Sequence, residues 1–202
     1  MPKWLDRLKG ERFDLECLSE VLITPGLTVV NEEGSFYLQS TEFDSLTSAD
    51  EVRERGKALI KLINGAAKFH IDGFQDVSEN GVTLVDDDGK KHQFIFVDGS
   101  ISLHGRVSAK VIEATSNGSQ HVVEQLNPVE RLIAIAQKYK VVADALNFYR
   151  DTTYISLYKV YEIIRDDVGG KDQLIRNGWV AGAKLSCFTQ TAQSRAALGD
   201  SA

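Results

Sequence analysis

Hydrophobic and polar residues follow two different periods along the chain, and the change lies near residue 120. Before it, apolar positions alternate with polar ones in short runs, which is typical of strands with one buried face. After it, apolar residues recur at spacings of three and four, which is typical of packed helices. The pattern predicts an α+β fold: an antiparallel, strand-rich N-terminal domain with one helix over residues 1–119, and a C-terminal helical bundle over residues 120–202.

In the N-terminal half the pattern predicts the order β-β-β-α followed by three strands. A loose alternation over residues 12–22 indicates a first strand, and Asn31-Glu32-Glu33-Gly34 is a good hairpin turn between the next two. Ser48-Ala49-Asp50-Glu51 forms a capping box that begins a helix, and Asn64-Gly65 offers the end of that helix. The three later strands are expected at residues 81–85, 92–97 and 101–111.

The C-terminal half begins after a linker expected at residues 115–119. Asn127 as a cap and Pro128 at the first helical position start one helix that keeps its spacing to about Tyr149. Further helices are expected from about residue 151 to Gly169-Gly170, over residues 171–176 and over residues 181–197.

Charge divides at the same place as the period. The net charge of −6 splits into −8 for residues 1–126, with 13 basic and 21 acidic side chains, and +2 for residues 127–202. An acidic half repels the nucleic-acid backbone, whereas the mildly basic helical half is compatible with nucleic acid. No apolar run is long enough to span a bilayer, so the sequence predicts a cytoplasmic protein with no membrane partner.

Residues with metal or acid–base chemistry do not form a recognisable motif. The four histidines, His70, His92, His104 and His121, lack the spacings of a zinc site, so neither a metal nor another cofactor is predicted. The two cysteines lie 170 residues apart and fit a reducing compartment. A row of His104, Arg106 and Lys110 on one predicted strand face offers an anion site, although such rows are usually solvated sheet faces.

Aromatic side chains concentrate in the helical half, where eight of the 17 in the chain fall within 50 residues. Basic residues lie among them, so these helices could stack on and neutralise a nucleotide or single strand, or simply pack a core. The candidate ligand-binding residues are Arg150, Tyr154, Tyr158, Glu162, Arg165 and Trp179. No catalytic residue is assigned.

Several segments of the helical half resemble a family of bacterial proteins without an assigned activity. They are Leu157-Tyr158-Lys159-Val160-Tyr161-Glu162-Ile163-Ile164, Asp167-Val168-Gly169-Gly170, Gly178-Trp179 and Phe188-Thr189-Gln190-Thr191-Ala192. Residues 199–202, Gly-Asp-Ser-Ala, resemble the start of that family's terminal Gly-x-x-Ala-Arg-His signature, which would be cut short here.

The helical half is also distantly similar to HEPN domains, helical bundles of prokaryotic defence and toxin systems. The resemblance implies a ribonuclease in members that carry Arg-x(4–6)-His. In this chain no arginine precedes a histidine at that spacing, and no histidine follows His121. The departure puts ribonuclease activity in doubt for this chain.

These observations favour a non-catalytic interaction or ligand-sensing protein, with a homodimer through the aromatic helices or another protein as partner. A HEPN-type ribonuclease or a nucleotide- or RNA-binding protein is the alternative. A small-molecule enzyme with a site between the two halves is a third possibility, and no motif supports it.

Overall fold

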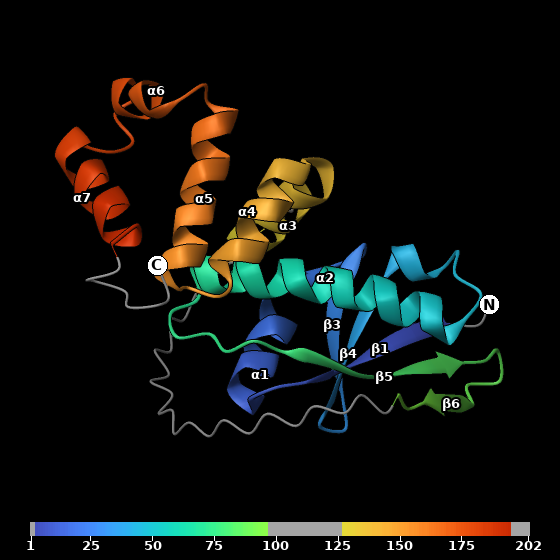
Figure 1. Ribbon diagram of the computed structural model, residues 1–202. Helices are drawn as coiled ribbons and strands as arrows, with labels where there is room; N and C mark the ends of the chain where they lie inside the picture. Colours follow the sequence, from blue (N-terminus) through green and yellow to red (C-terminus); the bar gives the residue numbers. More distant parts are fainter. Residues whose placement is uncertain (1–2, 97–126, 195–202) are drawn as a thin grey trace, which may run out of the picture. The chain divides into compact units, whose positions relative to one another are not determined.

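The computed structural model describes residues 3–96 and 127–194 of the chain. It confirms the α+β class: a six-stranded antiparallel sheet is built by the N-terminal part, and helices follow it (Figure 1). The strands are β1 (Lys3–Lys9), β2 (Ile23–Thr24), β3 (Leu27–Glu32), β4 (Ser35–Ser40), β5 (Ser78–Val85) and β6 (Lys91–Phe94). Their order across the sheet is β2-β3-β4-β1-β5-β6, so the first strand of the chain lies in the middle.

The helices include a long one that contributes to two compact units. They are α1 (Arg12–Val21), the 3-10 helix η1 (Thr41–Phe43), α2 (Ala49–His70), α3 (Pro128–Lys138), α4 (Lys140–Tyr149), α5 (Tyr154–Asp167), α6 (Lys171–Arg176) and α7 (Gly182–Ala192). Among the described residues, one unit consists of residues 3–60, 73–96 and 127–131, and the other of residues 61–72 and 132–194. The boundary predicted at residues 119/120 lies outside the described residues, as do the strand predicted at 101–111 and the linker predicted at 115–119.

The predicted strand over residues 12–22 is wrong, because this segment is the helix α1. Leu15, Leu18 and Leu22, spaced by three and four, are all buried and define its inner face. The same segment also alternates over shorter stretches, so its period is ambiguous at this length. The sheet unit therefore contains α1 in addition to the first part of α2, where the sequence predicted a single helix.

The central strand β1 has no counterpart among the predicted elements. Its sequence, Lys-Trp-Leu-Asp-Arg-Leu-Lys, places a carboxylate between apolar residues, and Leu5 and Asp6 are both buried although they point to opposite faces. A strand covered on both faces does not show the alternation that marks a strand with one wet face. The alternation of apolar and polar residues therefore did not predict β1.

The predicted start of α2 is confirmed and its predicted end is wrong. The backbone N–H of Glu51 donates to Ser48 Oγ at 3.3 Å, and the Ser48 N–H donates to Glu51 Oε2 at 3.2 Å, which completes the capping box. The helix continues through Asn64-Gly65 to His70. A glycine inside a helix costs about 1 kcal/mol, and packing against other residues can override that cost.

The long helix predicted from Pro128 to Tyr149 is interrupted. Tyr139 has extended backbone angles (φ −120°, ψ 109°) and separates α3 from α4. The spacing of apolar residues continues across this break, so the period alone could not locate it. The helix predicted over residues 171–176 is confirmed as α6, and the hairpins β3–β4 and β5–β6 lie where they were expected.

The strand register places Asp6 between two apolar residues of the neighbouring strands. Asp6 pairs with Leu38 of β4 and with Val82 of β5, and both of those neighbours are buried. Above Asp6 lies Gly56 of α2, where an added Cβ would fall 1.8 Å from Asp6 Oδ2. Helix and strand can approach this closely only because residue 56 has no side chain.

The Asp6 carboxyl group is fully buried, and neither of its oxygens has a hydrogen-bond partner. Burial, reinforced by the negative charge of Glu79, raises its pKa from the ordinary 3.8 to about 8, although Arg53 and Lys57 oppose the shift. Arg53 also pairs with Glu79 at 3.3 Å. Asp6 is therefore protonated at neutral pH, which avoids the cost of a buried charge.

Glu130 joins the beginning of α3 to β2 within the sheet unit. Its carboxylate accepts the backbone N–H groups of Ile23 at 3.0 Å and Thr24 at 2.9 Å, as well as the Thr24 hydroxyl. It also forms a capping box with Asn127, whose side-chain amide donates to the Val21 carbonyl. Burial opposes ionisation of Glu130, but the hydrogen bonds from Thr24, Ile23 and Asn127 outweigh it and lower the pKa.

Substitution of Gly56 by alanine tests the contact between α2 and β1. We expect Gly56→Ala to lower the free energy of unfolding by about 2 kcal/mol or more in urea titrations, because the new methyl group overlaps the Asp6 carboxyl group. In an Asp6→Ala background the same substitution should cost much less, since the overlapping oxygens are gone. Equal costs in both backgrounds would contradict the contact.

Substitution of Asp6 by asparagine tests its raised pKa. The folded state holds a proton that the unfolded state releases above pH 4, so this group's stabilisation is complete below about pH 4 and is lost as the pH rises to about 8. We expect wild type to lose stability relative to Asp6→Asn between pH 5 and 8, by up to roughly 1.4 kcal/mol per pH unit. Urea midpoints measured across this range check it, with Asp88→Asn on an exposed turn as the control.

Candidate functional site

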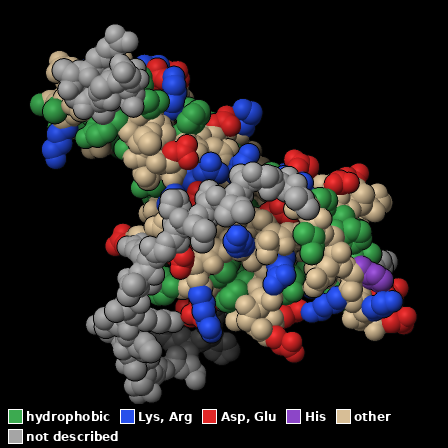
Figure 2. All heavy atoms as spheres, turned by 60° about the horizontal axis from the view of Figure 1, so that its bottom comes forward, with side chains coloured by type: hydrophobic (Ala, Val, Ile, Leu, Met, Phe, Trp, Pro, Cys, Tyr) green, Lys and Arg blue, Asp and Glu red, His purple; other side chains and the backbone are tan. Residues whose placement is uncertain are grey.

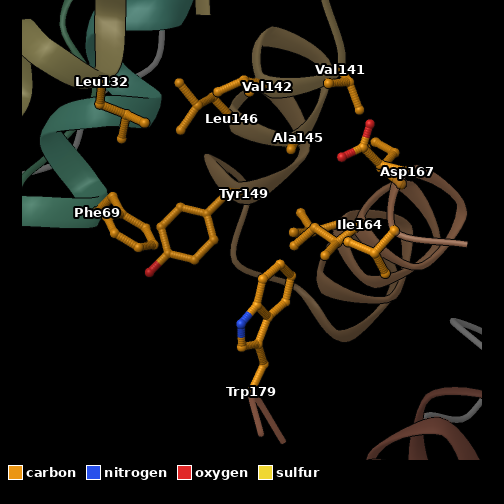
Figure 3. A pocket seen from close by; sticks show the side chains of 13 residues that line it. Phe69, Leu132, Val141, Val142, Ala145, Leu146, Tyr149, Ile164, Asp167 and Trp179 are labelled. Carbon is orange, nitrogen blue, oxygen red and sulfur yellow. The ribbon is translucent and has the colours of Figure 1, made fainter. Parts of the chain in front are cut away.

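The helical unit contains an open, mainly apolar pocket of about 320 Å³. Residues from the end of α2, from α3, α4 and α5, and from the segment after α6 line it (Figure 3). The lining residues are Phe69, Leu132, Val141, Val142, Ala145, Leu146, Tyr149, Val160, Ile163, Ile164, Asp167, Val168 and Trp179. All thirteen belong to the same compact unit.

Close packing of α2 against α4 forms one wall of the pocket. An added Cβ on Gly65 would lie 2.8 Å from the backbone oxygen and 2.9 Å from the Cβ of Leu146, a lining residue. Lys68, one turn further along α2, donates to the carbonyl oxygen of Arg150 at 2.6 Å, just after α4 ends. Gly65 therefore lies inside α2 because the helices approach each other there.

Aromatic rings form the more exposed part of the lining. Phe69 and Tyr149 pack edge to face with ring centroids 5.4 Å apart. The Phe69 side chain is 58% exposed and Trp179 is 63% exposed. Large apolar rings left this open beside a cavity are unusual for a packing core and are typical of a binding site.

Asp167 is the only ionisable acid or base in the pocket lining apart from the phenol of Tyr149. It is the last residue of α5, and its carboxyl group is turned toward the Val141 and Ala145 side chains of α4 (Figure 3). Among the described residues it makes no ion pair, whereas its neighbour Asp166 pairs with Arg165 at 2.7 Å. The pocket thus combines apolar walls with one unpaired carboxylate.

The structure does not bring the six predicted ligand-binding residues together in one pocket. Trp179 lines the pocket. Tyr154, Tyr158, Glu162 and Arg165 lie along a different face of α5 from the lining residues, as their helical spacing requires.

The predicted residues outside the pocket have other contacts. Tyr158 belongs to an aromatic cluster with Tyr161 and Phe188, and its hydroxyl accepts a hydrogen bond from Gln193 at 2.7 Å. The Arg165 guanidinium lies over the Tyr161 ring, 5.7 Å from its centroid, and the predicted ligand-binding role of Tyr158 and Arg165 stays a prediction.

Glu162, Arg150 and Tyr154 complete the predicted set. Glu162 pairs with Lys159 at 2.8 Å on the helix surface. The Arg150 carbonyl oxygen, just after the end of α4, accepts a hydrogen bond from Lys68. Tyr154 is exposed at the start of α5. The predicted homodimer through these helices stays a prediction.

Sequence reasoning missed Phe69 and did not single out Asp167. Phe69 comes from the half of the chain that was predicted to form only the sheet domain, and α2 was predicted to end before it. Asp167 was named only within the segment Asp167-Val168-Gly169-Gly170 that resembles the bacterial family. A helix that continues past its glycine, with an aromatic residue near its end, is the signal that could have indicated Phe69.

The described part of the chain shows neither a metal-ion site nor a membrane-spanning helix. In residues 3–96 and 127–194, no group of three His, Cys, Asp or Glu side chains lies close enough to hold a metal ion. None of the helices in these ranges is long and apolar enough to cross a bilayer. The predicted row of His104, Arg106 and Lys110 lies outside the described residues.

Comparisons with known proteins returned no relative. No family model, no curated protein and no solved structure matches the chain. The resemblance to HEPN domains and to the bacterial family therefore stays a prediction, and function is inferred from the geometry of the chain itself.

Substitution of Gly65 by alanine tests the wall between α2 and α4. We expect a loss of about 2 kcal/mol in the free energy of unfolding, because the methyl group would press on the Leu146 backbone, which cannot move aside as a flexible side chain can. Urea denaturation followed by circular dichroism measures it. Gly182→Ala in α7 of the same unit serves as the control, since an added Cβ there would make only an ordinary contact, 3.4 Å from the end of the Ile175 side chain, and a similar loss in both variants would contradict the prediction.

Proposed function

We propose that this protein is a non-catalytic ligand-binding module whose helical unit holds a small, mainly apolar ligand that carries a cationic or hydrogen-bond-donating group. The observation that supports this most directly is the pocket of about 320 Å³ with apolar walls and the single carboxylate of Asp167. Binding sites for small molecules typically combine an apolar lining with a few polar groups that orient the ligand.

The volume and the lining favour a compact ligand. Sites for small molecules span roughly 300–1,000 Å³, so this pocket lies at the lower end of that range. Aliphatic side chains of α4 and α5 supply the inner wall, and the rings of Phe69, Tyr149 and Trp179 supply flat faces near the opening. A ring or short aliphatic chain would bury these surfaces from water, which is favourable by about 25 cal/mol per Å².

Asp167 favours a ligand that carries a positive charge. A carboxylate with no ion-pair partner beside apolar side chains attracts an ammonium group or a strong hydrogen-bond donor. Aromatic faces in the same pocket also attract cations through their quadrupole. An amine with an apolar body satisfies both features.

The non-catalytic assignment rests on which side chains line the pocket. The thirteen lining residues include no serine, threonine, cysteine, histidine or lysine, so the pocket offers no nucleophile with an adjacent base. Asp167 and the phenol of Tyr149 lie on different helices, and the carboxyl group faces aliphatic side chains. The side chains that line the pocket are therefore suited to binding a ligand.

Calorimetric titration of the full chain with 2-phenylethylamine and its neutral analogue 2-phenylethanol tests the proposal. We expect both compounds to bind and the amine to bind about tenfold more tightly, because it forms a charge-assisted hydrogen bond with Asp167. Asp167→Asn should abolish the preference for the amine, and Ala145→Leu, which fills the pocket, should weaken both compounds.

Asp166→Asn is the matched control, since Asp166 pairs with Arg165 and does not line the pocket. It should leave both affinities unchanged. Thermal unfolding of each variant confirms that the helical unit is folded. Failure of both compounds to bind at millimolar concentration, or an equal effect of Asp166→Asn and Asp167→Asn, would overturn the proposal.

A further inference from the structure

A second cleft, of about 280 Å³, lies in the sheet unit at the end of the central strand. It is formed where β1 passes into α1, beside the turn between β3 and β4 and the irregular part of β5. The residues that line it are Arg7, Leu8, Lys9, Gly10, Arg12, Leu15, Gly34, Ser35, Phe36 and Asn80.

Every charged residue that lines this cleft is a cation. Arg7 and Lys9 are two residues apart on β1 and therefore share one face of the strand, and Arg12 follows in the first turn of α1. No aspartate or glutamate is among the lining residues. The composition is unexpected, since acidic side chains outnumber basic ones by 21 to 13 in residues 1–126.

The two strand cations have no anionic partner among the described residues. The Arg7 guanidinium is half-buried, and its polar contact is a long one, 3.5 Å from Nη2 to Ser35 Oγ. Lys9 is exposed and makes no ion pair within that part of the chain. A half-buried guanidinium without a carboxylate costs free energy that a bound anion would recover.

Arg12 can also turn toward a ligand. Its Nε pairs with Glu16 Oε1 at 2.8 Å, but the Arg12 side chain is 84% exposed, and such a surface pair contributes little to stability. On the face of the molecule that Figure 2 shows, acidic and basic side chains are mixed. Three cations around one hollow, with no acidic side chain in its lining, create a local positive potential.

Uncharged groups of the cleft suit an oxyanion as well. The Ser35 hydroxyl and the Asn80 amide can both donate hydrogen bonds, and Gly10 and Gly34 present backbone without side chains. Arginine forms paired hydrogen bonds with two oxygens of a phosphate, and lysine adds a point charge. A carboxylate offers only two oxygens, whereas a phosphate presents three or more to donors on several sides.

We propose that this cleft binds the phosphate group of a small ligand, with Arg7 and Lys9 as the principal contacts and Arg12, Ser35 and Asn80 completing the site. The volume accommodates one or two phosphate groups with a small remainder. The site belongs to the sheet unit and does not depend on the pocket of the helical unit.

Calorimetric titration of the full chain with sodium phosphate and with pyrophosphate, at constant ionic strength in chloride, tests this site. We expect saturable binding of at least one of them with one site per chain. Arg7→Gln and Lys9→Gln should each weaken it about tenfold or more, because each removes a charge-assisted hydrogen bond. Arg7→Lys keeps the charge but loses the planar fork, and should weaken binding less than Arg7→Gln.

Lys90→Gln and Arg131→Gln are the matched controls, since both residues are exposed in the same unit and do not line the cleft. They should change the affinity less than twofold. Thermal unfolding checks that Arg7→Gln is folded, and Lys9→Gln at an exposed position provides the test if it is not. Absence of saturable binding, or equal weakening by the controls, would overturn the proposal. Binding of a short single-stranded RNA without binding of phosphate or pyrophosphate would also overturn it.

Discussion

The close approach of α2 to the central strand is the constraint on which the sheet unit depends. Asp6 lies in the middle of a six-stranded sheet, between the buried Leu38 and Val82, and α2 passes over it at Gly56. Any side chain at position 56 would overlap the carboxyl group. The helix therefore tolerates a glycine in its interior, and the sheet tolerates a carboxyl group that is kept neutral by burial.

A similar arrangement recurs further along the same helix. Gly65 lets α2 approach Leu146, which belongs to α4 in the helical unit, and this contact forms one wall of the apolar pocket. Because α2 continues to His70, it delivers Phe69 to the pocket opening. One helix thus supplies a close contact to each compact unit, through two glycines nine residues apart.

The two proposed sites differ in chemistry as their units differ in composition. The helical unit, whose sequence is rich in aromatic residues, holds an apolar pocket with a single carboxylate. The sheet unit, whose sequence is acidic, holds a cleft lined only by cations. Each site contains a charged side chain without an ion-pair partner beside a pocket large enough for a ligand. In the helical unit this side chain is Asp167, and in the sheet unit it is Arg7.

The sequence by itself determined the α+β class, the two strand hairpins, the capped start of α2 and most helices of the second half, because caps, turns and period are local properties. It did not determine that residues 12–22 form a helix, that α2 continues beyond Gly65 or that β1 lies in the middle of the sheet. These depend on what packs against each segment, and local propensities of about 1 kcal/mol are overridden there by burial. The sites were decided only by tertiary structure, since Phe69 and Trp179, or Arg7 and Asn80, are brought together by contacts between residues far apart in the chain.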